Sequence, residues 1–85
     1  MRTFYWYKQC PRCKQGELTI MEDLTHRRLY FHCGECETGF LRPEDTDDSE
    51  KGFLTRAEDF EAESPSLERI VSLGWGEFAK HRFDN

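Results

Sequence analysis

The sequence predicts a small α+β domain: a three-stranded sheet built around a β-hairpin, with a carboxy-terminal helix packed on it. Two observations favour the sheet. Two Cys-x-x-Cys pairs flank nineteen residues in which apolar and polar side chains alternate, and an aromatic run precedes the first pair. A third observation favours the helix, because Leu67, Ile70 and Val71 recur at helical spacing after a serine–proline start.

A chain of 85 residues is expected to form one domain, residues 1–85. Hydrophobic residues make up 36 % of it, so its core is thin. Aromatic residues make up 14 %, so much of the apolar burial must come from rings. We divide the domain into a cysteine-containing part (1–42), an acidic connector (43–63) and a helical element (64–85).

The first expected element is a strand over residues 3–9, because a run of aromatic residues favours extended backbone. Alternation places Phe4 and Trp6 on one face of this strand. Tyr5 and Tyr7 then lie on the other face. One face is expected in the core, and the outer rings are candidates for contact with a partner.

The expected hairpin joins strands over 17–23 and 28–32 through a polar turn. Leu18 and Ile20 alternate with polar residues in the first strand, and Leu29 and Phe31 share a face of the second. A short third strand over 38–42 follows the second cysteine pair, and a proline ends it. The pattern over 53–63 leaves helix and strand open.

The helical element begins with two residues suited to a helix start. Ser64 can cap the helix, and Pro65 fits the first helical position, where its missing N–H costs nothing. Gly74 is expected to end the helix in a left-handed cap, with Trp75 folding back onto Ile70. A last helical turn is expected over 77–82.

All four cysteines lie in the two pairs, Cys10 with Cys13 and Cys33 with Cys36. A Cys-x-x-Cys turn brings two sulfurs to one metal from a single bend, and two such pairs are typical of a four-thiolate zinc site. Gly34 is expected to supply a left-handed backbone angle in the second turn. We therefore predict one structural Zn²⁺ per chain, bound by these four cysteines.

Four cysteines also serve in iron–sulfur clusters, disulfides and redox pairs. Disulfides need an oxidising compartment, and the first eight residues lack the apolar run and cleavage site of an export signal. A thioredoxin-like pair needs a βαβ pattern, which the sequence lacks. Zinc is therefore favoured, and a cytoplasmic location is expected. No apolar stretch approaches the roughly 20 residues of a membrane span.

Residues 4–42 resemble a zinc ribbon. The resemblance rests on the four cysteines, on Gly16 after the first pair, and on the hairpin pattern between the pairs. Zinc ribbons occur in transcription factors, ribosomal proteins, enzymes and protein-binding adaptors, so this resemblance implies a metal site and no single function. The ribbon spacing, the acidic connector and Gly74 with Trp75 also resemble small bacterial immunity-type proteins of toxin systems. That resemblance implies an acidic inhibitor of a basic nuclease.

Catalysis is not expected from this sequence. Four cysteine ligands close the zinc coordination, so no water can be activated there. The three histidines, at 26, 32 and 81, are scattered, and no Ser–His–Asp or phosphate-loop arrangement is present. We predict that the protein is not an enzyme.

The formal net charge of −5 is unevenly distributed, with +2 over residues 1–42 and −7 over 43–85. An acidic protein repels phosphate backbones at long range. We therefore predict a protein-interaction module with a basic protein partner and leave its oligomeric state open. The alternative is a nucleic-acid-binding or transcription-associated ribbon that uses Arg27 and Arg28 at the hairpin return. The expected partner-binding residues are the acids Asp45, Asp47 and Asp48 and the rings Tyr5, Tyr7 and Phe53.

Overall fold

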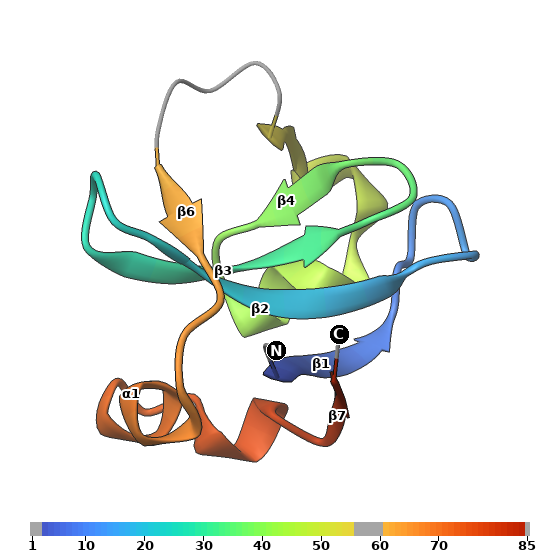
Figure 1. Cartoon of the computed structure of the whole chain (residues 1–85). Helices are drawn as coiled ribbons and strands as arrows, with labels where there is room; N and C mark the ends of the chain where they lie inside the picture. The colour runs from blue at the N-terminus through green and yellow to red at the C-terminus, as the bar shows by residue number, and fades with distance from the viewer. Residues whose placement is uncertain (1–2, 56–60, 85) are drawn as a thin grey trace.

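The strands of the chain form one antiparallel sheet around a central hairpin. A computed structural model describes residues 3–55 and 61–84. Within these residues the strand order is β5-β4-β3-β2-β1-β7, and the short β6 pairs with β2 (Figure 1). The strands are β1 (Thr3–Gln9), β2 (Glu17–Asp23), β3 (Arg28–Cys33), β4 (Thr38–Phe40), β5 (Phe53–Leu54), β6 (Ala62–Glu63) and β7 (His81–Asp84).

The β2–β3 hairpin confirms the prediction between the two cysteine pairs. Its register runs from Leu18 opposite Cys33 to Asp23 opposite Arg28. The turn contains Arg27 in the left-handed region, with φ of 54°. Alternate residues of both strands point to one face and are buried there, which is why the period-2 pattern was readable in the sequence.

Strand β1 spans the predicted residues and separates its rings onto two faces. Tyr5 and Tyr7 are half-buried and pack against the core. On the opposite face Phe4 stacks on Phe83 with ring centroids 5.1 Å apart. These phenylalanines are direct cross-strand neighbours in the β1–β7 register.

Strand β7 begins at His81, inside the helical turn expected over 77–82, so that prediction was wrong for the residues after Phe78. A short 3₁₀ turn, η4 (Gly76–Phe78), comes first, and the chain then pairs with β1. Trp6 stacks on His81 across this pair at 4.1 Å. The pairing joins residues from opposite ends of the chain, and a contact of that range leaves little local pattern.

The acidic connector contains regular structure as it follows β4. Two 3₁₀ helices, η1 (Pro43–Asp47) and η2 (Ser49–Lys51), lead into β5, which pairs with β4. The strand alternative therefore holds for Phe53 and Leu54, while residues 56–60 lie outside the described residues. Strand β4 ends at Phe40, before the expected end at 42.

The α-helix α1 (Leu67–Ser72) begins later than predicted. Ser66 is its N-cap and accepts a hydrogen bond from the Arg69 N–H at 3.2 Å. The hydroxyl of Ser64, the expected cap, instead donates to the Thr3 carbonyl at 3.0 Å. Pro65 is buried ahead of the helix rather than in its first turn.

The end of α1 confirms the predicted left-handed cap. Gly74 has φ of 83°, and its N–H donates to the Val71 carbonyl. The Trp75 N–H donates to the Ile70 carbonyl at 2.9 Å, which completes the two bonds of a Schellman motif. Only Ile70 of the predicted apolar face enters the core, whereas Leu67 is 45 % and Val71 58 % exposed. Of the three residues at helical spacing, Ile70 is therefore the one that the fold buries.

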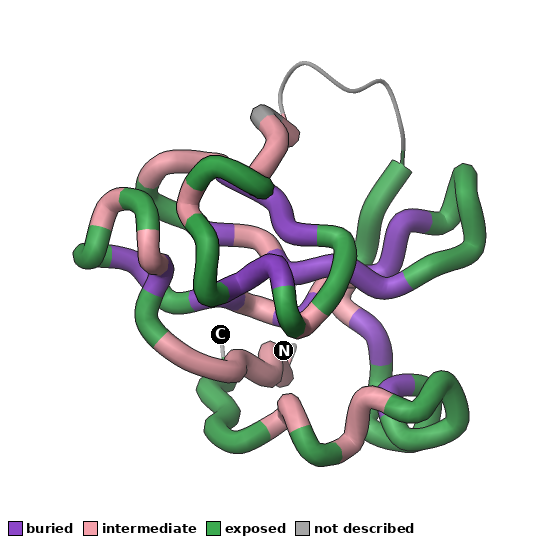
Figure 2. The backbone as a smooth tube through the Cα atoms, turned by 180° about the vertical axis from the view of Figure 1, so that it is seen from behind, coloured by how far each residue is buried: buried purple, intermediate pink, exposed green. Residues whose placement is uncertain are grey.

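The core lies along the middle strands of the sheet, where Figure 2 shows most of the buried backbone. Phe31 is its centre. It stacks on Trp75 at 4.6 Å and lies 5.5 Å from Tyr7 between ring centroids. The buried residues that form this core cluster are Cys10, Leu18, Ile20, Leu29, Phe31, Cys33, Phe40 and Ile70.

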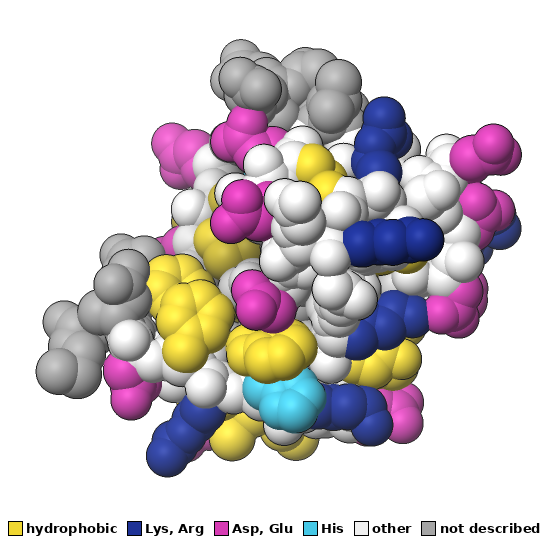
Figure 3. Space-filling model, turned by 90° about the vertical axis from the view of Figure 1, so that its right-hand side faces the viewer, with side chains coloured by type: hydrophobic (Ala, Val, Ile, Leu, Met, Phe, Trp, Pro, Cys, Tyr) yellow, Lys and Arg dark blue, Asp and Glu magenta, His cyan; other side chains and the backbone are white. Residues whose placement is uncertain are grey.

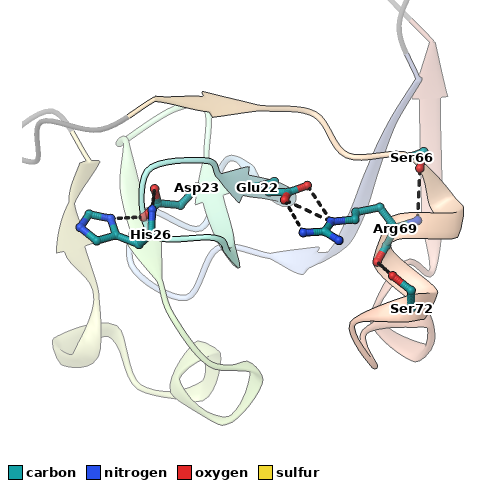
Figure 4. Close-up of polar contacts among 6 residues, drawn as sticks. All are labelled: Glu22, Asp23, His26, Ser66, Arg69 and Ser72. Atoms are coloured by element: carbon teal, nitrogen blue, oxygen red, sulfur yellow. Dashed lines mark hydrogen bonds and ion pairs between the residues drawn. The ribbon is translucent and has the colours of Figure 1, made fainter.

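Two buried carboxylates of β2 are satisfied by neighbouring elements (Figure 4). Glu22 receives hydrogen bonds from Arg69 of α1 through Nε at 3.2 Å and Nη2 at 3.0 Å. Asp23 lies 2.7 Å from His26 Nδ1 and accepts from the His26 backbone N–H at 3.0 Å. Burial raises the pKa of Asp23, but these bonds and the charges of His26 and Arg28 outweigh it and hold that pKa below its ordinary value.

Among the described residues no helix is long and apolar enough to cross a membrane.

Candidate metal centre

Both cysteine pairs lie at the same end of the sheet because of the hairpin register. Three residues separate the first pair from the start of β2, and the second pair begins at the last residue of β3. Antiparallel pairing places Leu18 opposite Cys33, so the start of β2 lies beside the end of β3. Figure 1 shows both turns on the right of the molecule, away from the β2–β3 turn.

The two cysteine turns have the same backbone geometry. In the first, the Lys14 N–H donates to the Cys10 carbonyl at 3.0 Å, and in the second the Glu37 N–H donates to the Cys33 carbonyl at 2.9 Å. Lys14 and Glu37 both adopt left-handed backbone, with φ of 58° and 56°. Each turn therefore closes at the residue after its second cysteine.

The expected role of Gly34 in the second turn was wrong. Among the glycines of the described chain only Gly74 has a positive φ. A Cβ atom placed on Gly34 would also meet nothing within 4 Å. Neither backbone angle nor space requires glycine there, because the residue after Cys36 carries the left-handed angle.

The four cysteine sulfurs are positioned to bind one metal ion. All of them lie within 4.8 Å of one another. Cys10 Sγ is 3.8 Å from Cys36 Sγ, and Cys13 Sγ is 3.5 Å from Cys33 Sγ. A tetrahedron with metal–sulfur bonds of about 2.3 Å has sulfur–sulfur edges of about 3.8 Å. The four cysteines are free, and these separations exceed the roughly 2.05 Å of a disulfide bond.

Gly16 allows the first turn to approach the sulfurs of the second. A Cβ atom on Gly16 would lie 2.6 Å from Cys33 Sγ and 2.9 Å from Glu35 Cγ. The Gly16 carbonyl also accepts a hydrogen bond from the Cys10 N–H at 2.8 Å. The glycine therefore contributes to the cluster through its lack of a side chain.

The sulfurs differ in their surroundings. Burial raises the pKa of the Cys33 thiol to about 12 and also raises that of Cys10. Backbone hydrogen bonds from Gln15 and then Gly16 lower the pKa of Cys13 to about 6. A metal bound here must displace the thiol protons, so its affinity depends on pH.

The chemistry of this donor set is that of a structural site. Four thiolates complete a tetrahedral shell and leave no position for an activated water. Two of the sulfur-bearing residues, Cys10 and Cys33, are buried within the core itself. Cys36 Sγ lies 3.2 Å from the Thr38 hydroxyl, a polar neighbour that our sequence reasoning did not identify. The position of Thr38, two residues after Cys36, was the sequence signal for this contact.

The acidic partner-binding candidates lie in and beside η1, and they differ in exposure. Asp45 is buried and accepts from Arg42 Nε at 3.4 Å, while its Oδ1 has no hydrogen-bond partner. Asp47 is exposed and pairs with Lys8 of β1. Asp48 is exposed and caps η2 by accepting from the Glu50 N–H at 3.0 Å.

The aromatic candidates are partly committed to the fold. Tyr7 packs between Phe31 and Phe78, at 5.5 and 5.2 Å between centroids. Tyr5 packs against the same core, and Phe53 is half-buried with its ring 6.2 Å from that of Tyr30. Their partner-binding role stays a prediction.

Comparisons with family models, with curated proteins and with solved structures found no match for this chain.

Proposed function

We propose that this protein is a non-enzymatic, zinc-stabilised module that binds a basic protein through its acidic surface. The four-sulfur cluster is the observation that carries the metal part of the proposal. Two of its sulfur pairs, 3.8 and 3.5 Å apart, match the edges of a single-ion tetrahedron, and thiolates are preferred ligands of zinc.

An iron–sulfur cluster fits these four sulfurs less well than a single metal ion does. An iron–sulfur cluster places several irons and sulfides between its thiolates, so those thiolates must lie farther apart than the ligands of one ion. A single iron ion would occupy the same tetrahedron as zinc. Metal analysis of the purified protein separates these two ions.

The arrangement of charges supports a protein partner over a nucleic acid. Several cations of the first half of the chain already face a carboxylate, which weakens their attraction for phosphate. Exposed pairs of this kind add little stability, but they reduce the positive field of the surface. The pairs are Lys8 with Asp47, Arg28 with Asp23, and Arg42 with Glu44 and Asp45.

The acidic surface comprises the exposed carboxylates of η1, η2 and the residues around β6. Their summed field speeds encounter with a basic partner, while packed apolar groups supply most of the affinity. An immunity-type inhibitor of a basic nuclease is the narrower form of this proposal. Within these segments the exposed acids that the structure describes are Glu44, Asp47, Asp48, Glu50, Glu61 and Glu63.

The side of the molecule that includes β7 supplies apolar contact area. Figure 3 shows hydrophobic side chains and a histidine grouped there, with charged side chains around them. Phe83 is 44 % exposed, and its stack on Phe4 holds it in one position. Rings that are already fixed lose little entropy when a partner covers them.

Two charge variants test the proposal against the nucleic-acid alternative. One carries Asp47→Asn and Asp48→Asn, in which asparagine can still cap η2, and the other carries Arg27→Gln and Arg28→Gln. Partners are captured from the source cell at about 0.15 M salt, and short oligonucleotides are titrated in parallel. We expect a basic protein whose association slows in the acid variant. Oligonucleotide binding at this salt, lost only in the arginine variant, would overturn the protein-partner proposal.

A further inference from the structure

A second concave site lies away from the cysteine cluster, where the start of β3 and the end of β4 meet the end of α1. This pocket has a volume of about 420 Å³. Arg27, Arg28 and Arg42 line it, and we call it the arginine pocket. We propose that the arginine pocket binds an organic phosphate monoester of nucleotide size, a role separate from the proposed protein-binding function.

The sheet register brings the three arginines together. Phe31 pairs with Phe40 in the β3–β4 ladder, so residues before Phe31 lie beside residues after Phe40. Arg28 at the start of β3 and Arg42 just past β4 are therefore neighbours. Arg27 precedes them in the hairpin turn with its left-handed backbone.

The arginines retain free hydrogen-bonding edges. Arg28 contacts Asp23 through Nε at 3.3 Å, and Arg42 contacts Asp45 through Nε at 3.4 Å. Arg42 Nε also lies 3.8 Å from Glu44. These contacts use the inner nitrogen of each guanidinium, and within residues 3–55 and 61–84 the terminal nitrogens of Arg28 and Arg42 have no hydrogen-bond partner. Arg27 has no ion-pair partner within the part of the chain that the structure describes.

The donor geometry of the pocket favours a phosphate monoester over a carboxylate. Three arginines and Glu44 line the pocket, while Asp23 and Asp45 pair with Arg28 and Arg42, so the local formal charge is zero and the guanidinium donors carry the selectivity. A phosphate monoester carries about −1.5 to −2 and three acceptor oxygens, so it can engage more than one guanidinium fork. A carboxylate offers two oxygens and a single charge.

The remaining lining favours a ligand with an apolar ring. Leu29, Leu41, Leu73 and Trp75 form the apolar part of the pocket. The volume is many times the roughly 30 Å³ share of one water molecule, so inorganic phosphate alone leaves most of the pocket unfilled. A planar base or similar ring would cover this apolar surface while its phosphate faces the arginines.

Two-dimensional NMR titration of the full chain with adenosine 5′-monophosphate tests this inference. We expect saturable shifts of the Trp75 indole N–H and of the Leu73 amide, with a Kd of about 1 mM or below. Arg27→Gln should weaken binding at least about tenfold, because it removes a charge-assisted donor pair. Lys80→Gln is the matched control: it removes one positive charge from an exposed residue outside the pocket, and binding should be unchanged.

Three further probes define what would overturn the inference. Inorganic phosphate and adenosine alone should each bind at least about tenfold more weakly than the monophosphate, since each uses half of the site. Equal binding of inorganic phosphate would contradict the role of the apolar lining. Absence of saturable shifts, or equal affinity of the Arg27→Gln variant, would contradict the site. An oligonucleotide whose affinity grows with length and survives Arg27→Gln would show a general polyanion surface instead.

Discussion

Replacing Gly16 by alanine perturbs the cysteine cluster without removing a ligand. The added Cβ would lie 2.6 Å from Cys33 Sγ, about 1 Å inside normal van der Waals contact. Glu35 also lies within 3 Å, but its exposed side chain can move away. Cys33 is buried, and its sulfur cannot move without changing its position relative to the other three.

The size of the effect follows from this overlap. Overpacking of one methyl group in a well-packed region costs about 1–3 kcal/mol. If the strain is relieved by displacing the sulfur, the metal affinity falls by about fivefold to 150-fold. If it is relieved by opening the first turn, the metal-loaded protein loses the same free energy of unfolding. Both routes lower the chelator concentration at which the metal is released.

A second glycine of the cysteine turns provides the control. Gly34→Ala adds the same methyl group next to Cys33, where it meets nothing within 4 Å. Its effect should stay within about 0.5 kcal/mol, as for an ordinary surface substitution. The assay is zinc release to a chromophoric chelator, measured for both variants and the parent. Release of zinc at the same chelator concentration from both variants would refute the packing argument.

Further substitutions test the contacts between the sheet and the carboxy-terminal element. Trp75→Ala should lower the free energy of unfolding in urea by about 2–3 kcal/mol, because the ring stacks on Phe31. This is less than the roughly 3–5 kcal/mol of a fully buried ring, since Trp75 is half-buried, and an unchanged urea midpoint would contradict the packing. Arg69→Gln should cost about 1–2 kcal/mol, since it leaves buried Glu22 without its charged partner, and Lys80→Gln should cost nothing measurable. The pKa of Asp23 is lowered in the folded protein, so its carboxylate adds to the free energy of unfolding at pH values above the ordinary pKa of 3.8. This contribution is lost as the pH falls through the pKa of the folded state. Asp23→Asn should therefore cost about 1.5–3 kcal/mol at pH 7, and equal stability at that pH would contradict the assignment.

Local patterns in the sequence were sufficient to predict the hairpin, β1 and the cysteine cluster. Leu18 and Ile20 alternate with polar residues because one face of β2 is buried, and that period is visible in a single strand. The cysteine spacing encodes two turns that each hold two sulfurs. Gly74 and Trp75 predicted the helix end because a Schellman motif is a local structure.

Features that depend on distant contacts were not predictable in this way. The pairing of β7 depends on β1, and its short sequence carries no β-branched residue. The helix start was misplaced because Pro65 favoured Ser64 over Ser66 as the cap, whereas a contact with the distant Thr3 takes the Ser64 hydroxyl. Left-handed backbone at Lys14 and Glu37 also contradicts residue preference, because the turn geometry imposes it.

Metal analysis combined with unfolding tests the central claim most directly. The protein is purified under reducing conditions, its metal content is measured by mass spectrometry, and circular dichroism follows the fold as a chelator is added. We predict one zinc per chain and loss of the folded signal on chelation, because structural zinc contributes on the order of 10 kcal/mol in finger peptides. Cys33→Ser should reproduce this loss without chelator. A metal-free chain that keeps its fold and melting temperature, or one that is isolated with iron, would contradict the claim.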